Sequence, residues 1–195
     1  MLFVGAAKVA MKKVMRKTIN RTLIKTTVLL ALLSPALPLH SYAQDVTDAT
    51  LANAANSAEE WLTYGRDYSE TRFSPLNQID TGNVTDLGMA WTFDTESFRG
   101  LEATPLVHNG IMYATRAWSS VFALDARTGR QLWNYDPQVD RSIGWKACCD
   151  VVNRGVALYE GKIFVGTIDG RLIALDANTG AVIWDVLTVD PERPY

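Results

Sequence analysis

Two stretches of this chain repeat each other, and the repeat restricts the folds that are open to it. Residues Gly110–Trp133 align without a gap with Gly161–Trp184, which lie 51 positions further on. The segments that end the two copies, VFALDARTGRQLW and LIALDANTGAVIW, share Ala, Leu, Asp, Ala, Thr, Gly and Trp at identical offsets. A repeat of about 50 residues is typical of β-propellers, in which each copy forms one blade.

Each copy predicts four short antiparallel strands. Asn109-Gly110 suits a tight hairpin turn with positive φ, and the stretch from Asp125 to Gly129 suits a type I turn. No helical period persists for more than one turn between residues 103 and 190, so we expect no helix there. The fold class is therefore all-β, most simply a propeller. In the first copy we expect strands at Ala103–Val107, Ile111–Thr115, Ser120–Asp125 and Arg130–Asp136.

Tryptophans end both copies and suggest how blades pack together. Trp133 and Trp184 are expected on outer strands, where a large apolar ring with an N–H donor can contact the next blade. The segment Gly88–Asp94 repeats the same Trp-x-aromatic-Asp pattern and is expected to be the outermost strand of another blade. Two blades and a lone strand leave open edges, which stable proteins avoid. We therefore expect these residues to be the front part of a longer propeller.

The N-terminal segment 1–43 has the layout of a secretory signal peptide. It holds seven basic and no acidic residues, then the apolar run Val28–Leu33, then Ser-Tyr-Ala ending at Ala43. This order predicts cleavage after Ala43, a mature chain that starts at Gln44, and a periplasmic location. An uncleaved anchor is the alternative, although the apolar run is far shorter than the roughly 20 residues of a spanning helix. Translation could also begin at Met11.

The region between the leader and the repeat is less regular. Asp45–Glu60 is expected to form a short helix, and Trp61–Gly82, rich in Gly, Pro, Asp and Ser, is expected to be a loop. The predicted organisation is a signal peptide at 1–43, a helix, loop and lone strand at 44–102, and two blades at 103–195.

Charge and missing motifs exclude several classes of function. Residues 44–195 hold 12 Lys and Arg against 21 Asp and Glu, a net charge of −9, which makes nucleic acid a poor partner. No Gly-x-Gly-x-x-Gly follows a strand, so a nicotinamide enzyme is not expected. Histidine chemistry is not expected either, because His40 lies in the leader and His108 in a predicted turn.

Cys148 and Cys149 are adjacent and are the only cysteines in the chain. Neighbouring Cα atoms lie about 3.8 Å apart, below the usual disulfide range of about 4.4–6.8 Å. A bond between them would close a small strained ring, and strained disulfides tend to be labile, regulatory or catalytic. The alternative is two reduced cysteines in a core. Export to an oxidising compartment makes the bond chemically plausible, but both interpretations remain open.

The repeats together with ACCDVVNRG resemble the quinoprotein alcohol dehydrogenases, which are periplasmic eight-bladed propellers that carry pyrroloquinoline quinone (PQQ). WLTYGRDYSETRFSPLNQI, RGLEATPLV and VGTIDGRLIALDANTG are also similar to that family, so the resemblance runs from about Trp61 to Tyr195. The repeat alone is shared with cofactor-free propellers, whereas the cysteine pair followed by Asn153-Arg154 is far more specific. The resemblance implies two of eight blades plus the outer strand of the closing blade.

The resemblance also implies site residues. The family's quinone-stacking disulfide falls on Cys148 and Cys149, and its cofactor-binding Glu and Arg fall on Glu102 and Arg154. One repeat after position 102 is position 153, so both charged residues should start successive innermost strands, from which an Arg fork can reach a carboxylate near the axis. The plainer interpretations are a solvated carboxylate and a surface ion pair. The residues that hold calcium, the catalytic base and the quinone's other face would lie beyond Tyr195.

The implied reaction is oxidation of an alcohol to an aldehyde by hydride transfer to the quinone. Calcium would act as a Lewis acid, and electrons would pass to a cytochrome c or to a fused haem c domain. The chain contains no Cys-x-x-Cys-His for haem attachment and is not expected to be active by itself. The alternative is a cofactor-free propeller that serves as a cell-envelope scaffold or assembly factor, for which the cysteine pair has no reason.

Overall fold

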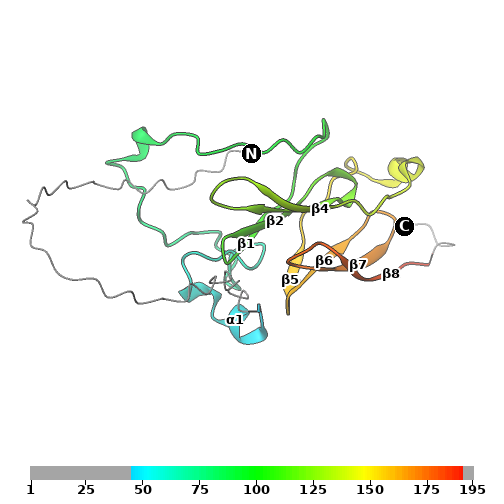
Figure 1. The fold of residues 1–195 in the computed structure, drawn as a ribbon, viewed down its shortest axis with the longest axis horizontal. Coiled ribbons are helices and arrows are strands. Elements are labelled where there is room, and N and C mark those ends of the chain that lie inside the picture. The colour runs from blue at the N-terminus through cyan, green and yellow to red at the C-terminus, as the bar shows by residue number, and fades with distance from the viewer. Residues whose placement is uncertain (1–44, 191–195) are drawn as a thin grey trace, which may run out of the picture. The chain divides into compact units, whose positions relative to one another are not determined.

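The computed structural model describes residues 45–190, and the predicted signal peptide lies outside them. Two antiparallel four-stranded sheets follow one another, with strand orders β1-β2-β3-β4 and β5-β6-β7-β8 (Figure 1). Each strand pairs with the next strand along the chain, as in a propeller blade. The strands are β1 Leu106–His108, β2 Ile111–Thr115, β3 Val121–Asp125, β4 Gln131–Tyr135, β5 Ala157–Tyr159, β6 Lys162–Gly166, β7 Arg171–Asp176 and β8 Val182–Leu187.

The register of the two sheets confirms the 51-residue repeat. Ala123 pairs with Trp133 in the first blade, and Ala174 pairs with Trp184 in the second. Both ladders also shift register directly after that alanine. The main error concerns β1, which begins three residues later than expected, because Pro105 has no N–H to donate to a ladder.

The turns form as their sequences predict. Asn109 and Gly110 both have positive φ, at 50° and 75°. In the first blade, Oδ1 of Asp125 accepts hydrogen bonds from the backbone N–H groups of Arg127 and Thr128, each at 3.0 Å. Asp176 makes the same pair of bonds in the second blade. The segment from Asp to Gly that recurs in both blades is therefore a structural turn, and its residues are not candidates for a functional site.

The core lies between the two blades and on the outer face of the first. Strand β3 is buried on both faces, so that Val121 and Ala123 join the core shared with the second blade, while Phe122 and Leu124 point to the opposite side. This is why the strand reads as an unbroken apolar run rather than an alternating one. The shared core contains Tyr113, Val121, Ala123, Trp133, Ile163, Val165, Ile173 and Leu175.

Trp133 joins the two blades as predicted. Its side chain is 8% exposed, and its Nε1 donates to the carbonyl of Ala177 at 3.0 Å. The ring packs against Gly180, where an added Cβ would lie 2.6 Å from it. A side chain at that turn would therefore separate the blades, which explains why the repeat keeps a glycine there.

Trp91 makes the equivalent contact with the first blade. Its Nε1 donates to the carbonyl of Ala126 at 3.2 Å, and an added Cβ at Gly129 would lie 2.5 Å from its ring. The segment Gly88–Asp94 thus docks where an outer strand of a preceding blade would dock. We expected it to be a strand, and the structure shows that it is not. No strand within residues 45–190 forms a ladder with it, and extended backbone becomes a strand only through a ladder partner.

The N-terminal helix is shorter than the predicted Asp45–Glu60. Helix α1 covers Asp48–Ala52, with Thr47 as its N-cap, and a single 3₁₀ turn, η1, follows at Ala54–Asn56. The guanidinium of buried Arg66 donates to the carbonyls of Ala54, Ala55 and Ser57, and it pairs with Asp67 at 2.8 Å. These bonds use the carbonyls that a longer helix would need, so a tertiary contact ends the helix.

The segment after this helix attaches to β1. Trp61 and Val107 exchange two backbone hydrogen bonds of 2.9 Å. His108 is the buried last residue of β1 rather than a turn residue, and its Nδ1 lies 2.8 Å from Glu60. Burial by itself raises the pKa of Glu60, but hydrogen bonds from His108 and from the N–H of Asn109 outweigh it and lower that pKa. Residues 61–82 otherwise form the predicted loop.

Short 3₁₀ helices occupy three further connections. They are η2 (Val84–Asp86), η3 (Ala117–Ser119) and η4 (Arg141–Lys146). The expectation of no helix after residue 103 is therefore wrong for η3 and η4, which arise where the chain must turn sharply between strands rather than from a 3.6-residue pattern. No helix within residues 45–190 is both long and apolar enough to cross a membrane.

Candidate functional site

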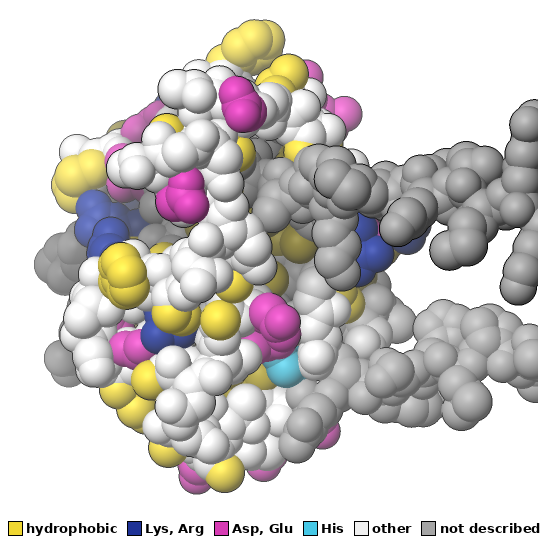
Figure 2. All heavy atoms as spheres, turned by 90° about the vertical axis from the view of Figure 1, so that its left-hand side faces the viewer, with side chains coloured by type: hydrophobic (Ala, Val, Ile, Leu, Met, Phe, Trp, Pro, Cys, Tyr) yellow, Lys and Arg dark blue, Asp and Glu magenta, His cyan; other side chains and the backbone are white. Residues whose placement is uncertain are grey.

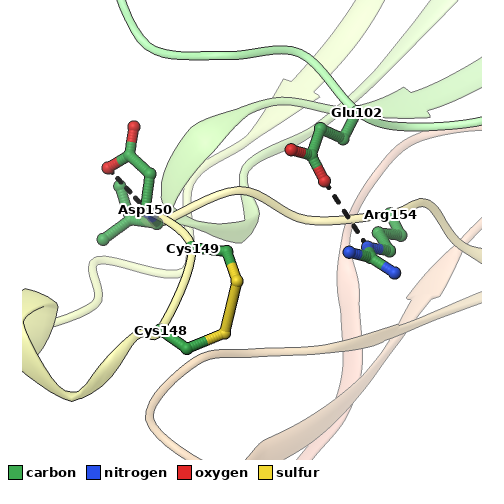
Figure 3. Close-up of a disulfide and its surroundings, with 6 residues drawn as sticks. Glu102, Cys148, Cys149, Asp150 and Arg154 are labelled. Carbon is green, nitrogen blue, oxygen red and sulfur yellow. Dashed lines mark hydrogen bonds and ion pairs between the residues drawn. A yellow bond between two sulfur atoms is a disulfide. The ribbon is translucent and has the colours of Figure 1, made fainter.

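The connection between β4 and β5 carries the two cysteines. It begins with η4, which Asp140 caps by accepting a 2.8 Å hydrogen bond from the N–H of Ser142. Cys148 and Cys149 follow, both exposed, with their sulfur atoms paired as a disulfide and their Cα atoms 3.8 Å apart (Figure 3). Because both are exposed, the structure does not show the alternative of two reduced core cysteines.

Trp118 contacts the connection between β4 and β5 at two points. It lies in η3 with a φ of 64°, and its backbone N–H donates to the carbonyl of Val151 at 2.8 Å. Its ring packs against Gly144, where an added Cβ would lie 2.8 Å away, and the guanidinium of Arg141 lies 4.3 Å from the ring centre. Trp118 thus contacts the chain on both sides of the cysteine pair, through its ring before the cysteines and through its backbone N–H after them.

A second contact holds the loop just after the cysteines. Asp150 has a φ of 71° and forms an ion pair with Arg99. The N–H of Val151, which donates to Asp150 at 2.8 Å, and the charge of Arg99 together lower the pKa of that carboxyl. An exposed ion pair contributes little by itself, but here it ties the tip of the loop to the segment that leads into β1.

Glu102 and Arg154 meet at the starts of the two blades, as the repeat predicts. Arg154 Nε lies 3.5 Å from Glu102 Oε2, and the two side chains point toward one another (Figure 3). The backbone N–H of Thr104 also donates to the carbonyl of Arg154 at 3.2 Å, so the two segments run side by side. The side chains are 76% exposed for Arg154 and 44% for Glu102, and both groups are therefore accessible to a ligand.

Arg154 keeps most of its hydrogen-bonding capacity in this arrangement. Its contact with Glu102 is longer than the 2.7 and 2.8 Å contacts that Arg171 makes with Asp185 and Asp169. A guanidinium has five N–H donors. The arrangement can therefore accept an anionic group, above all a carboxylate that takes two parallel bonds.

Tyr64 is a further polar group beside this pair, and the sequence did not single it out. The guanidinium of Arg72 lies 4.1 Å from the centre of its ring. Hydrogen bonding with Arg72 is the main cause that lowers the pKa of Tyr64, and Thr104 and the charge of Arg154 act in the same direction. Its position follows from the antiparallel pairing of Trp61 with Val107, which brings residue 64 beside residue 104 and which only the structure reveals.

A cavity among the described residues lies away from these groups. It measures about 530 Å³, lies between the segment around Trp91 and the outer face of the first blade, and includes none of the four predicted site residues. Hydrophobic side chains are also exposed at several points of the face shown in Figure 2. The lining of the cavity includes the apolar cluster of Met112, Phe122 and Leu124, so the cavity belongs to the packing of the Trp91 segment on the first blade. No group of three or more His, Cys, Asp or Glu within residues 45–190 lies close enough to hold a metal ion.

Comparison with known proteins identifies the family. The family model described as "Glucose/ethanol/alcohol dehydrogenase, beta-propeller domain" matches residues 61–185. The chain is 51% identical over 172 residues to "Quinohemoprotein alcohol dehydrogenase ADH IIB" of Pseudomonas putida, covering 88% of this chain and 25% of that protein. It is 56% identical over 137 residues to "1-butanol dehydrogenase (cytochrome c)" of Thauera butanivorans, covering 70% of this chain and 20% of that protein.

A solved structure gives the same result. The crystal structure of the quinohemoprotein alcohol dehydrogenase from Comamonas testosteroni superposes with a TM-score of 0.71 at 56% identity, covering 76% of this chain and 22% of that one. The chain thus spans about a quarter or less of the length of these relatives. The matched residues include all four predicted site residues and both blades except the end of β8. The chain therefore belongs to the PQQ β-propeller family of glucose, ethanol and alcohol dehydrogenases.

Proposed function

We propose that this chain supplies two blades, and one side of the cofactor site, of a PQQ-dependent alcohol dehydrogenase. The observation that carries the proposal is the exposed Cys148–Cys149 pair on the loop that leads directly to Arg154 and its partner Glu102. Relatives that are 51% and 56% identical over the aligned residues are named as an alcohol dehydrogenase and a 1-butanol dehydrogenase, which supports the same class of reaction. A scaffold protein would need neither the paired cysteines nor an exposed Arg154.

The residues present fit the cofactor that the family implies. PQQ is planar and carries three carboxylates, so it requires a flat surface and a cationic hydrogen-bond donor. The exposed disulfide offers the flat surface, and the guanidinium of Arg154 offers cationic donors that its contact with Glu102 leaves available. Glu102 would orient Arg154 through their ion pair and would add an acceptor at the same edge.

The chain's own residues would bind and orient, whereas the cofactor carries the chemistry. When bound, PQQ supplies the carbonyl that accepts a hydride from the alcohol carbon. Arg154 would hold a carboxylate, and the disulfide would cover one face and exclude water from it. We place the calcium ion, the catalytic base and the group on the opposite face on residues outside 45–190.

Location and electron acceptor complete the proposal. The signal-peptide pattern of residues 1–43 supports export to the periplasm, where the cysteines would be oxidised. The name of the Thauera butanivorans relative includes the words "cytochrome c", which supports a c-type cytochrome or a fused haem c domain as electron acceptor. The substrate class is a primary alcohol or a related alcohol.

The test is reconstitution of the full-length protein with PQQ and calcium. We expect alcohol-dependent reduction of an artificial acceptor and stoichiometric PQQ binding. Arg154→Ala should weaken PQQ binding about 10- to 100-fold, because a charge-assisted hydrogen bond is lost. The matched control is Arg127→Ala, since Arg127 is an exposed turn residue of the first blade. The proposal is wrong if the wild-type protein does not bind PQQ, or if Arg154→Ala binds it as tightly as the control.

A further inference from the structure

Asn153 lies between the cysteine pair and Arg154, and both N–H donors and the oxygen of its amide group form hydrogen bonds. Nδ2 donates to Ser119 Oγ at 3.1 Å and to the carbonyl of Gly166 at 2.9 Å. Oδ1 accepts a 3.0 Å hydrogen bond from the N–H of Gly155. The carbonyl of Asn153 accepts a fourth bond, of 3.2 Å, from Thr115 Oγ1.

The partners of Asn153 belong to fixed parts of both blades. Thr115 ends β2 and is 0% exposed, Ser119 belongs to η3 and is 1% exposed, and Gly166 ends β6. Asn153 therefore joins the first blade, the second blade and the loop at one point. The neighbouring residues are held as well, because Val151 accepts from Trp118 and Arg154 accepts from Thr104.

The side-chain hydrogen bonds at position 153 require an amide group. An amide is a neutral side chain with two N–H donors and an acceptor oxygen. Aspartate would keep the bond from Gly155 but would turn a charge toward the carbonyl of Gly166. Serine could still accept from Gly155, as in a Ser/Thr turn, but it is too short to reach the partners in both blades.

Gly155 completes the unit on the other side of Arg154. Its φ is 129°, and an added Cβ would lie 3.1 Å from the carbonyl oxygen of Thr104. A side chain there would be strained and would push the Arg154 segment away from β1. The sequence Asn-Arg-Gly thus combines an anchor, an exposed cation and a close backbone approach.

We propose that Asn153 is a positioning residue that holds Arg154 and the Cys148–Cys149 loop in one orientation relative to both blades. This inference rests on the proposed function. Asn153 would not contact the cofactor; it would remove the need to order the loop on binding, which increases affinity without adding a contact. The same anchoring would resist the rearrangement of the loop that accompanies opening of the S–S bond, and would therefore slow its reduction although both cysteines are exposed.

The experiment compares wild type with Asn153→Ala and Asn153→Ser in the full-length protein. The first readout is the Kd for PQQ in the presence of calcium. The second, on protein without PQQ, is the rate at which dithiothreitol reduces the cysteine pair. We expect both variants to bind PQQ about tenfold more weakly, as loss of hydrogen bonds of ordinary strength would give. We also expect them to be reduced several-fold faster.

Two controls separate positioning from general destabilisation. Asn134→Ala removes an exposed amide from β4 of the first blade and should change neither the Kd for PQQ nor the rate of reduction. Trp133→Phe removes the Trp133–Ala177 hydrogen bond between the blades and should leave PQQ affinity within about twofold of wild type, since a single ordinary hydrogen bond distant from the loop is lost. If Asn153→Ser changes the two readouts no more than Trp133→Phe does, the inference is wrong.

The outcomes also distinguish this inference from the proposed function. Absence of PQQ binding by the wild-type protein contradicts the proposed function, and the reduction rates still test whether Asn153 anchors the loop. Tight wild-type binding with unchanged Asn153 variants contradicts the inference alone. If Asn153→Ala does not fold, Asn153→Ser, which keeps the local turn bond, decides the result.

Discussion

The contact between Trp133 and the second blade gives the sharpest test of the architecture. Trp133→Phe keeps an aromatic ring in the core but removes the N–H that donates to the carbonyl of Ala177 at 3.0 Å. Trp133 is 8% exposed and Ala177 is 5% exposed, so the carbonyl would lose its partner away from water. A buried group left without its hydrogen bond costs about 1–3 kcal/mol. Lost packing area from the smaller ring adds to this cost.

The assay is urea denaturation of the full-length protein without cofactor, followed by tryptophan fluorescence and circular dichroism. We expect the first unfolding transition of Trp133→Phe to shift by an amount that corresponds to at least about 1 kcal/mol. Gly180→Ala should also destabilise, because its φ is 71° and the new Cβ would lie 2.6 Å from the Trp133 ring. Trp145→Phe is the control, since that ring is 80% exposed.

A double-mutant cycle tests the reason for the effect. In the double variant, the smaller phenylalanine ring leaves room for the alanine Cβ at position 180, so the two costs should be less than additive. Strict additivity would mean that the Trp133 ring does not pack on Gly180. A shift for Trp133→Phe no larger than that for Trp145→Phe would refute the role of Trp133 in joining the blades.

Three further predictions follow from the leader, from an ion pair and from the cysteines. N-terminal sequencing of exported protein should find Gln44 first, and an intact leader would contradict the signal-peptide prediction. The lowered pKa of Glu60 means that its link to His108 stabilises the fold above the ordinary pKa of about 4.3 and is lost as pH falls through the folded value. Glu60→Gln should therefore flatten the acid limb of stability, by less than about 1 kcal/mol. Replacing both Cys148 and Cys149 by Ala should impair cofactor binding or electron transfer more than folding, because so short a loop hardly restricts the unfolded chain; outright unfolding in circular dichroism would contradict this.

Local and periodic features of the fold could be predicted from the sequence. The two four-stranded blades, the Asp125 turn and the place of Trp133 follow from residue types at fixed offsets, and they formed as expected apart from the late start of β1. The closeness of Glu102 and Arg154 also follows from the repeat, because they lie within one position of equivalence and corresponding positions in successive blades are neighbours. Such features depend on short-range chemistry that each copy repeats.

Errors arose where a distant contact overrides local preference. Residues 45–60 favour a longer helix, but Arg66 takes the carbonyls that it would need. The segment Gly88–Asp94 has the composition of a strand, yet it lacks a ladder partner among residues 45–190. Local propensity is a weak prior that tertiary contacts often overrule.

The predicted site residues were exposed ones, whereas the residues that hold them in place emerged only from the tertiary structure. The cysteine pair and Arg154 carry distinctive chemistry and stand out in any reading of the chain. The supporting roles of Trp118 and Asn153 do not, because they depend on distant partners. Trp118 bonds to Val151, 33 positions away, and Asn153 bonds to Ser119 and Thr115, which are 34 and 38 positions away. The sequence by itself determined which groups the loop presents, and the packing of two blades decided their orientation, since only long-range hydrogen bonds fix a loop in space.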